Sequence, residues 1–314
     1  MTPSEPSQPT PAPSSGSRIE RREVAVEGVR FVVDRGEPRK KGRHATPTLL
    51  LHGVPETRAM WEPLASELAR DRITIAPDLK GLGESEARPP YDIPTLVREL
   101  AALALHEVDD RIDVVGHDWG GSLALALALS RPDLVRRLVV INAPYRYIDF
   151  THAWHMPLFA LPVVPDAIFA LGGRDLIGWM LDHGATKPID EQRRQRYMDA
   201  YADRERVLAM LAYYRTAVRG RLLRTVSGAV RRSSSGAAPR PPAQRPESTL
   251  VIWGAEDPAL PVPVGEAVVR DLGSSARFVS LPGVGHFSVD EASEQVVDLV
   301  SAFLREEAKE RAPA

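Results

Sequence analysis

Short apolar runs alternate with helical patterns along most of the chain, and this rhythm leaves few folds open. Parallel strands need long crossover connections, usually helices, so the alternation predicts an α/β fold with a mostly parallel sheet flanked by helices. The first two strands should form an antiparallel hairpin around Glu27-Gly28 at one edge. Strands are predicted at residues 22–34, 47–52, 72–77, 111–116, 136–142, 249–254 and 276–281.

Two segments depart from this rhythm. Residues 123–129 alternate Leu with Ala, as a strand would, but both are strong helix formers, which favours a buried helix. Residues 144–220 hold an aromatic, proline-rich stretch and then a helical pattern over 190–218, which predicts a helical cap inserted between two strands.

These patterns divide the chain into four parts. We expect a disordered, Pro- and Ser-rich tail at 1–18, a first core part at 19–143, the cap at 144–220 and a second core part at 221–314. The polar stretch at 231–249 predicts a flexible surface connection.

Charge and composition exclude several classes of function. The 40 Lys and Arg nearly balance the 42 Asp and Glu among 314 residues, so no basic field predicts a nucleic-acid partner. The absence of cysteine excludes thiolate catalysis and Cys-based metal sites. No secretory signal and no apolar run of membrane-spanning length stand out, so a cytoplasmic protein that does not bind membranes is expected, and a homodimer stays open.

The motif Gly116-His117-Asp118-Trp119-Gly120 lies between a predicted strand and a predicted helix. It resembles the nucleophile elbow of the α/β-hydrolases, in which two glycines permit a cramped turn that raises the central side chain above the sheet. Asp118 occupies the nucleophile position. The alternative is an ordinary turn with a capping aspartate.

An aspartate at this position restricts the reaction. A serine that attacked a saturated carbon would form an ether, which the enzyme could not cleave. An aspartate forms an alkyl ester instead, and water can hydrolyse that ester at the carboxyl carbon of Asp118 itself. The residue therefore indicates substitution at an sp³ carbon that carries an epoxide oxygen or a halide.

Ester hydrolysis also requires an oxyanion hole. The loop after the strand at 47–52 reads His52-Gly53-Val54-Pro55, and in this fold such a loop supplies one backbone N–H group. We assign the N–H groups of Val54 and Trp119 to the oxyanion. His52, Gly53 and Pro55 are expected to support the loop, His52 through hydrogen bonds to the backbone, and a cis bond before Pro55 would fix it.

Hydrolysis needs a base as well, and the chain order nucleophile, acid, histidine indicates where to look. His286 stands in a glycine-flanked loop after the strand at 276–281. Asp257, just past the strand at 249–254, is the candidate acid that orients it, with Glu256 as the second choice. Asn142, at the end of another strand, cannot serve as a carboxylate.

Together these motifs resemble the epoxide hydrolases of the α/β-hydrolase family, over about residues 22–305 and with residues 76–85 as a further similar stretch. The resemblance implies an eight-stranded sheet, no cofactor and no metal. Haloalkane dehalogenases share the elbow, but they hold the halide with an Asn or a second Trp, and the loop here has Val54. Fluoroacetate dehalogenases carry arginines where this chain has Trp119 and Ser122.

The resemblance also implies which groups stabilise the departing alkoxide. Tyr214 matches the second tyrosine of the epoxide hydrolase cap, and His155 stands where the first is expected, as in a bacterial subgroup that pairs His with Tyr. The alternative for His155 is a buried residue of the cap with no chemical role. Trp154, Met156 and Phe159 are expected to line a pocket for an apolar epoxide, with water as co-substrate, or else to form the core of the cap.

Two other functions remain as alternatives, and a third class is disfavoured by the aspartate at the elbow. A haloalkane dehalogenase would use the same nucleophile. A non-catalytic ligand-binding protein would not need the complete set of Asp118, Asp257 and His286. An esterase or a cofactor-free haloperoxidase would carry a serine at the elbow.

Overall fold

The computed structural model describes residues 18–38, 45–232 and 246–306. The tail expected at 1–18 lies outside the described residues except for Arg18, and so does the connection expected at 231–249 over residues 233–245. One eight-stranded sheet runs through the molecule in the order β1-β2-β4-β3-β5-β6-β7-β8. Its strands are β1 (Arg18–Val26), β2 (Val29–Glu37), β3 (Ala45–Leu51), β4 (Arg72–Pro77), β5 (Ile112–His117), β6 (Val135–Ile141), β7 (Ser248–Gly254) and β8 (Ala276–Leu281).

The hairpin around Glu27-Gly28 is present at the edge of the sheet, but both of its strands come from the run predicted as one strand at 22–34, and they extend beyond it to Arg18 and Glu37. Both turn residues have positive φ, 53° at Glu27 and 74° at Gly28, as tight two-residue hairpins require. The run at 47–52 is not a hairpin strand: it forms β3, which pairs in parallel with both β4 and β5. Every pairing from β4 to β8 is parallel, and β2 joins β4 in antiparallel fashion.

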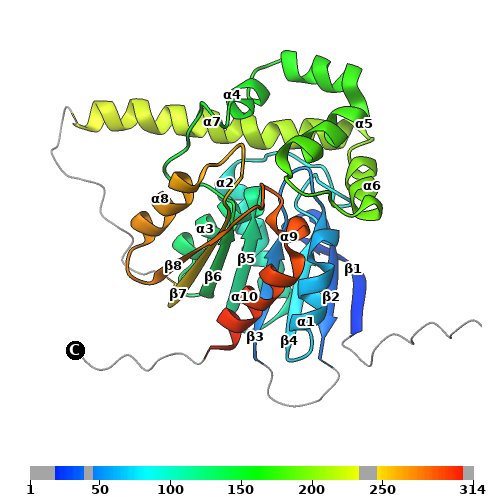
Figure 1. Cartoon of the computed structure of the whole chain (residues 1–314), viewed down its shortest axis with the longest axis vertical. Coiled ribbons are helices and arrows are strands. Elements are labelled where there is room, and N and C mark those ends of the chain that lie inside the picture. Colours follow the sequence, from blue (N-terminus) through cyan, green and yellow to red (C-terminus); the bar gives the residue numbers. More distant parts are fainter. Residues whose placement is uncertain (1–17, 39–44, 233–245, 307–314) are drawn as a thin grey trace, which may run out of the picture.

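Helices cover both faces of the sheet (Figure 1). The helices α1 (Glu62–Leu68) and α10 (Ser293–Arg305) pack together on one face, whereas α2 (Ile93–Glu107) and α3 (Asp118–Ser130) lie on the other. The helix α8 (Val262–Leu272) packs on β7 and β8, and the short α9 (Ser288–Glu291) precedes α10. This three-layer arrangement gives the central strands their continuous burial.

The alternating Leu and Ala segment is helical, as expected, and forms the body of α3. Leu123, Leu125 and Leu127 are all nearly inaccessible to solvent, because α3 packs against β5 and β6 and is also covered by α2. A helix that is apolar on most of its surface is stable only in such a buried position.

In the described part of the chain between β6 and β7, four helices are present, and they lie above the sheet in Figure 1. They are α4 (His155–Phe159), α5 (Val164–Gly184), α6 (Glu191–Ala200) and α7 (Arg204–Arg232). We call α4–α7 the inserted helices. The helical pattern over 190–218 is thus divided between α6 and α7, and α5 contains a break at Gly173, where φ is 49°.

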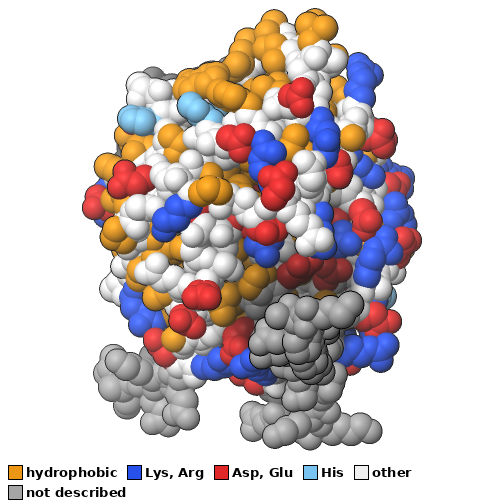
Figure 2. All heavy atoms as spheres, turned by 45° about the vertical axis from the view of Figure 1, so that its right-hand side comes forward, with side chains coloured by type: hydrophobic (Ala, Val, Ile, Leu, Met, Phe, Trp, Pro, Cys, Tyr) orange, Lys and Arg blue, Asp and Glu red, His pale blue; other side chains and the backbone are white. Residues whose placement is uncertain are grey.

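The first half of α5 exposes apolar side chains, and Figure 2 shows them gathered at the top of the molecule. Val163 is 74% exposed and Leu171 is 91% exposed. Among the described residues, no helix combines the length and the apolar character needed to cross a bilayer.

Candidate active site

The nucleophile elbow is formed where β5 runs into α3 without an intervening loop. Asp118 is the first residue of α3 and has a φ of 49°, a backbone conformation that side chains rarely adopt. Gly116 and Gly120 allow this turn: a Cβ on Gly120 would lie 2.1 Å from the carbonyl oxygen of Leu51, and one on Gly116 would lie 2.3 Å from that of Gly120. The turn therefore requires glycine at both positions.

The loop after β3 meets Asp118 directly. The N–H group of Val54 donates a hydrogen bond to Oδ1 of Asp118 over 3.0 Å. Trp119 lies in the first turn of α3, where backbone N–H groups have no acceptor within the helix. The Val54–Pro55 peptide bond is cis.

His52 stabilises this loop through hydrogen bonds of both ring nitrogens to backbone groups. Its Nδ1 lies 2.7 Å from the carbonyl oxygen of Gly53, and its Nε2 accepts the N–H of Leu79 over 2.9 Å. Burial lowers the pKa of His52, which keeps the imidazole neutral and suits one donor and one acceptor. His52 thus links the loop after β3 to the backbone of Leu79.

His286, Asp257 and Asp118 are brought together at the ends of three different strands. The Nδ1 atom of His286 lies 2.7 Å from Oδ2 of Asp257, and its Nε2 lies 3.6 Å from Oδ2 of Asp118. The other oxygen of Asp257 accepts the N–H groups of Ala259 and Leu260, each over 2.9 Å. Glu256, the second choice for the acid, is exposed.

These contacts shift the pKa values of His286 and Asp118 in opposite directions. Burial works against a charged imidazole, but the carboxylates of Asp257 and Asp118 outweigh it and raise the pKa of His286 well above its usual range. Burial would raise the pKa of Asp118, yet the hydrogen bond and charge of His286 lower it. The contacts of His286 with Asp257 and Asp118 thus favour the protonated form of its imidazole.

Asn142, which the sequence excluded as an acid, is a partner of the acid. Its Nδ2 donates to Oδ2 of Asp257 over 2.7 Å, and its Oδ1 accepts the hydroxyl of Ser288 and the N–H of Gly254. Its φ of 43° turns the chain at the end of β6 toward β7. In the sequence, the signal that could have indicated this role is a polar residue at the end of a central strand.

A second buried pair, Glu56 and His117, was also not anticipated. Oε2 of Glu56 lies 2.6 Å from Nδ1 of His117, and Nε2 of His117 lies 2.8 Å from the carbonyl oxygen of His286. Although burial lowers the pKa of His117, the carboxylate of Glu56 outweighs it and raises that pKa. The pair therefore holds the main chain of His286 in place.

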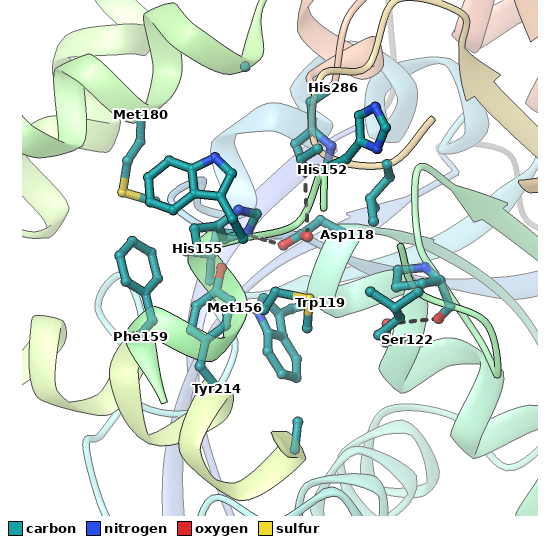
Figure 3. Close-up of a pocket in the computed structure, with 18 of the residues that line it drawn as sticks. Asp118, Trp119, Ser122, His152, His155, Met156, Phe159, Met180, Tyr214 and His286 are labelled. Carbon is teal, nitrogen blue, oxygen red and sulfur yellow. Dashed lines mark hydrogen bonds and ion pairs between the residues drawn. The ribbon is translucent and has the colours of Figure 1, made fainter. Parts of the chain in front are cut away.

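A cavity of about 1040 Å³ lies between Asp118 and the inserted helices. Tyr214 on α7 and His155 at the start of α4 both line it, and Figure 3 shows their side chains beside Asp118. Their rings meet edge to face with centroids 6.1 Å apart. The Tyr214 ring also meets the indole of Trp119 at 5.1 Å.

The two groups have different electrostatic states. Burial, aided by the nearby charge of Asp118, raises the pKa of Tyr214 above its usual range, so the phenol keeps its proton. Burial, together with the charge of His286, lowers the pKa of His155 to about 4. At neutral pH both are uncharged groups that can each donate one hydrogen bond into the cavity.

Apolar side chains form most of the remaining wall. Met156 and Phe159 line the cavity from α4, and the ring of Phe159 packs edge-on against Tyr214 at 5.2 Å. Trp154 also lines it but is 49% exposed, which places it at the rim. The described residues contain no group of three or more His, Asp or Glu side chains arranged to hold a metal ion.

Comparison with known proteins agrees with this architecture. Residues 46–293 match the model of the alpha/beta hydrolase fold. The chain belongs to the α/β-hydrolase family. Its sequence is 26% identical to that of Epoxide hydrolase 3 of Xenopus tropicalis over 272 residues. This alignment covers 82% of this chain and 71% of that protein.

Two solved structures show the same fold as this α/β-hydrolase. Cfl2 from Burkholderia cenocepacia aligns with a TM-score of 0.76 at 22% identity, covering 92% of this chain and 96% of that chain. A structure described under novel epoxide hydrolases from metagenomes of hot environments aligns with a TM-score of 0.73 at 24% identity, covering 92% and 100%.

Proposed function

We propose that this α/β-hydrolase is an epoxide hydrolase that converts an epoxide to a vicinal diol through a covalent ester on Asp118. The observation that carries the proposal is the aspartate at the elbow, which shares one largely apolar cavity with two hydrogen-bond donors, Tyr214 and His155. A carboxylate suits attack on a saturated carbon, and neutral donors suit an alkoxide that develops on ring opening. The epoxide hydrolase named among its relatives supports the same reading.

In the first step, Asp118 attacks one ring carbon, and the bond between that carbon and the epoxide oxygen breaks. Tyr214 transfers its proton to the departing oxygen while His155 donates a hydrogen bond to it. The inserted helices act as a cap in this scheme, because they supply both donors and exclude water from the apolar cavity.

In the second step, His286 becomes the base. Esterification removes the negative charge of Asp118, one of the two carboxylates that hold the pKa of His286 high. The imidazolium can then release its proton, and the phenolate of Tyr214 regains one, so that the two transfers balance. Neutral His286, oriented by Asp257, takes a proton from water, and the hydroxide attacks the carboxyl carbon of Asp118.

The oxyanion of the tetrahedral intermediate is stabilised by the N–H groups of Val54 and Trp119. Val54 already donates to Oδ1 of Asp118 in the resting site, so this donor is preorganised. Collapse of the intermediate releases the diol and regenerates the carboxylate. The scheme uses no cofactor or metal.

Turnover of styrene oxide, epichlorohydrin and 1-bromobutane tests the proposal, with diol and halide measured separately. We expect diol from the epoxides and no bromide from 1-bromobutane. Hydrolysis in H₂¹⁸O under single-turnover conditions should place ¹⁸O in Asp118 rather than in the first diol formed. Bromide release without diol, or epoxide turnover by an Asp118→Ala variant, would refute the scheme.

A further inference from the structure

The carboxylate of Glu291 ties together two segments that are far apart in the sequence. Its Oε2 accepts hydrogen bonds from the N–H and the hydroxyl of Thr186 and from the N–H of Lys187, over 2.8, 2.7 and 3.1 Å. These donors lie in the segment that joins α5 to α6. The same oxygen accepts the N–H of Gly285 over 2.9 Å, and Oε1 accepts the N–H of Phe287 over 3.1 Å.

Glu291 therefore accepts hydrogen bonds from the backbone on both sides of His286. Five donors on a single carboxylate are more than a surface side chain needs, and hydrogen bonds to a charged acceptor are the stronger kind. The two segments also touch directly, since the N–H of His286 donates to the carbonyl oxygen of Gly184 over 2.8 Å.

The end of α5 and the loop that carries His286 are tightly packed against each other. A Cβ on Gly285 would lie 2.6 Å from the carbonyl oxygen of Gly184 and 2.9 Å from the N atom of Thr186. The helix α5 ends at Gly184, and its last turns carry Trp179, Met180 and His183, which line the cavity. The wall of the substrate pocket and the backbone of His286 are thus parts of one connected unit.

We propose that Glu291 is a positioning residue that fixes His286 by tying its loop to the end of α5. This inference rests on the proposed function, because it assigns Glu291 to the step in which His286 acts. The side chain of Glu291 touches no reacting group and acts only through the backbone at 285 and 287. Its removal should slow ester hydrolysis and spare ester formation, which needs no proton transfer to His286.

The test measures the two half-reactions separately. Single-turnover mixing with styrene oxide gives the rate of ester formation, and intact-protein mass spectrometry of quenched samples gives the amount of ester. For Glu291→Ala we expect ester hydrolysis to slow by about 10-fold to 100-fold, since small misplacements of a catalytic group have effects of this size. Ester formation should change by less than about twofold, so that the ester accumulates.

Two further variants serve as comparisons. Glu294→Ala removes an exposed carboxylate three residues away and should leave both half-reactions unchanged. Glu291→Gln can keep an oxygen toward Thr186, Lys187 and Gly285 while its NH₂ group faces the N–H of Phe287. It should therefore slow hydrolysis by a smaller factor, and it decides the question if Glu291→Ala does not fold.

A second readout does not depend on turnover. The short contact between His286 and Asp257 should give a low-field proton resonance for Nδ1–H, which should broaden in Glu291→Ala and not in Glu294→Ala. Backbone amides at 186, 187, 285 and 287 should exchange faster together. If the wild type opens no epoxide, the proposed function fails while this readout still tests Glu291. Equal slowing of both half-reactions, or an unchanged resonance, would overturn the proposal.

Discussion

Replacing Asp257 by asparagine should stop ester hydrolysis while leaving the fold intact. The amide oxygen of asparagine can replace Oδ1 and accept the N–H groups of Ala259 and Leu260. Its NH₂ group then stands where Oδ2 was, 2.7 Å from Nδ1 of His286 and 2.7 Å from Nδ2 of Asn142. Donor would face donor, so His286 must turn its proton to Nε2, the atom that faces Asp118.

That tautomer cannot take a proton from water at Nε2. The same change of tautomer in the serine-protease triad lowers the rate about 10⁴-fold, which corresponds to about 5.4 kcal/mol. Ester formation does not use His286 as a base and should fall by less than about 10-fold, a loss below about 1.4 kcal/mol. The alkyl ester of Asp118 should therefore become the dominant species.

Rapid quenching followed by intact-protein mass spectrometry measures this directly. Asp257→Asn should carry one added mass of epoxide within the first seconds and retain it for hours. Glu256→Gln, which alters the exposed neighbour, is the matched control and should show only a transient adduct. If Asp257→Asn turned over within 10-fold of the wild type, or if no adduct appeared, the assignment of His286 as base would be wrong.

Three other outcomes are expected. Tyr214→Phe keeps the ring contact with Trp119 but loses the proton donor, so pre-steady-state ester formation should slow by about 100-fold or more. The imidazole of His155 should not titrate in an NMR experiment between pH 5.5 and 8, because its pKa lies at about 4. Since that pKa is depressed in the folded state, stability should be lost as pH falls from about 6.5 toward 4, and His155→Phe should reduce this loss in urea unfolding. Asn142→Leu removes one buried hydrogen bond each from Asp257, Gly254 and Ser288 and should lower the free energy of unfolding by about 1–3 kcal/mol, measured by chemical denaturation.

The parts of the site that could be predicted from the sequence are those where a reactive side chain stands next to glycines that mark a turn or a loop. The glycines around Asp118 specify a turn that only one kind of strand-to-helix junction uses, so the elbow could be located without any contact information. His286 lies in a glycine-flanked loop whose place in the chain order was enough to single it out. The structure brings both together with Asp257, although these three residues are spread over more than half of the chain.

Features that depend on contacts between distant segments could not be predicted. Asn142, Glu56 and Glu291 are polar residues whose partners lie elsewhere in the chain, and nothing in their immediate neighbours identifies those partners. The division of the pattern at 190–218 into two helices was missed for a local reason. The residues between α6 and α7 include neither Gly nor Pro, so the usual signals of a helix end are absent.

The direct passage from β5 into α3 restricts which insertions and deletions the sequence can tolerate. The strand ends at His117 and the helix begins at Asp118, with no residue between them to absorb a change in length. One inserted residue in the first turn would rotate the rest of α3 by about 100° about its own axis. The side chains of α3 that pack against β5 and β6 would then lose these contacts. The elbow is therefore restricted in length as well as in its two glycines.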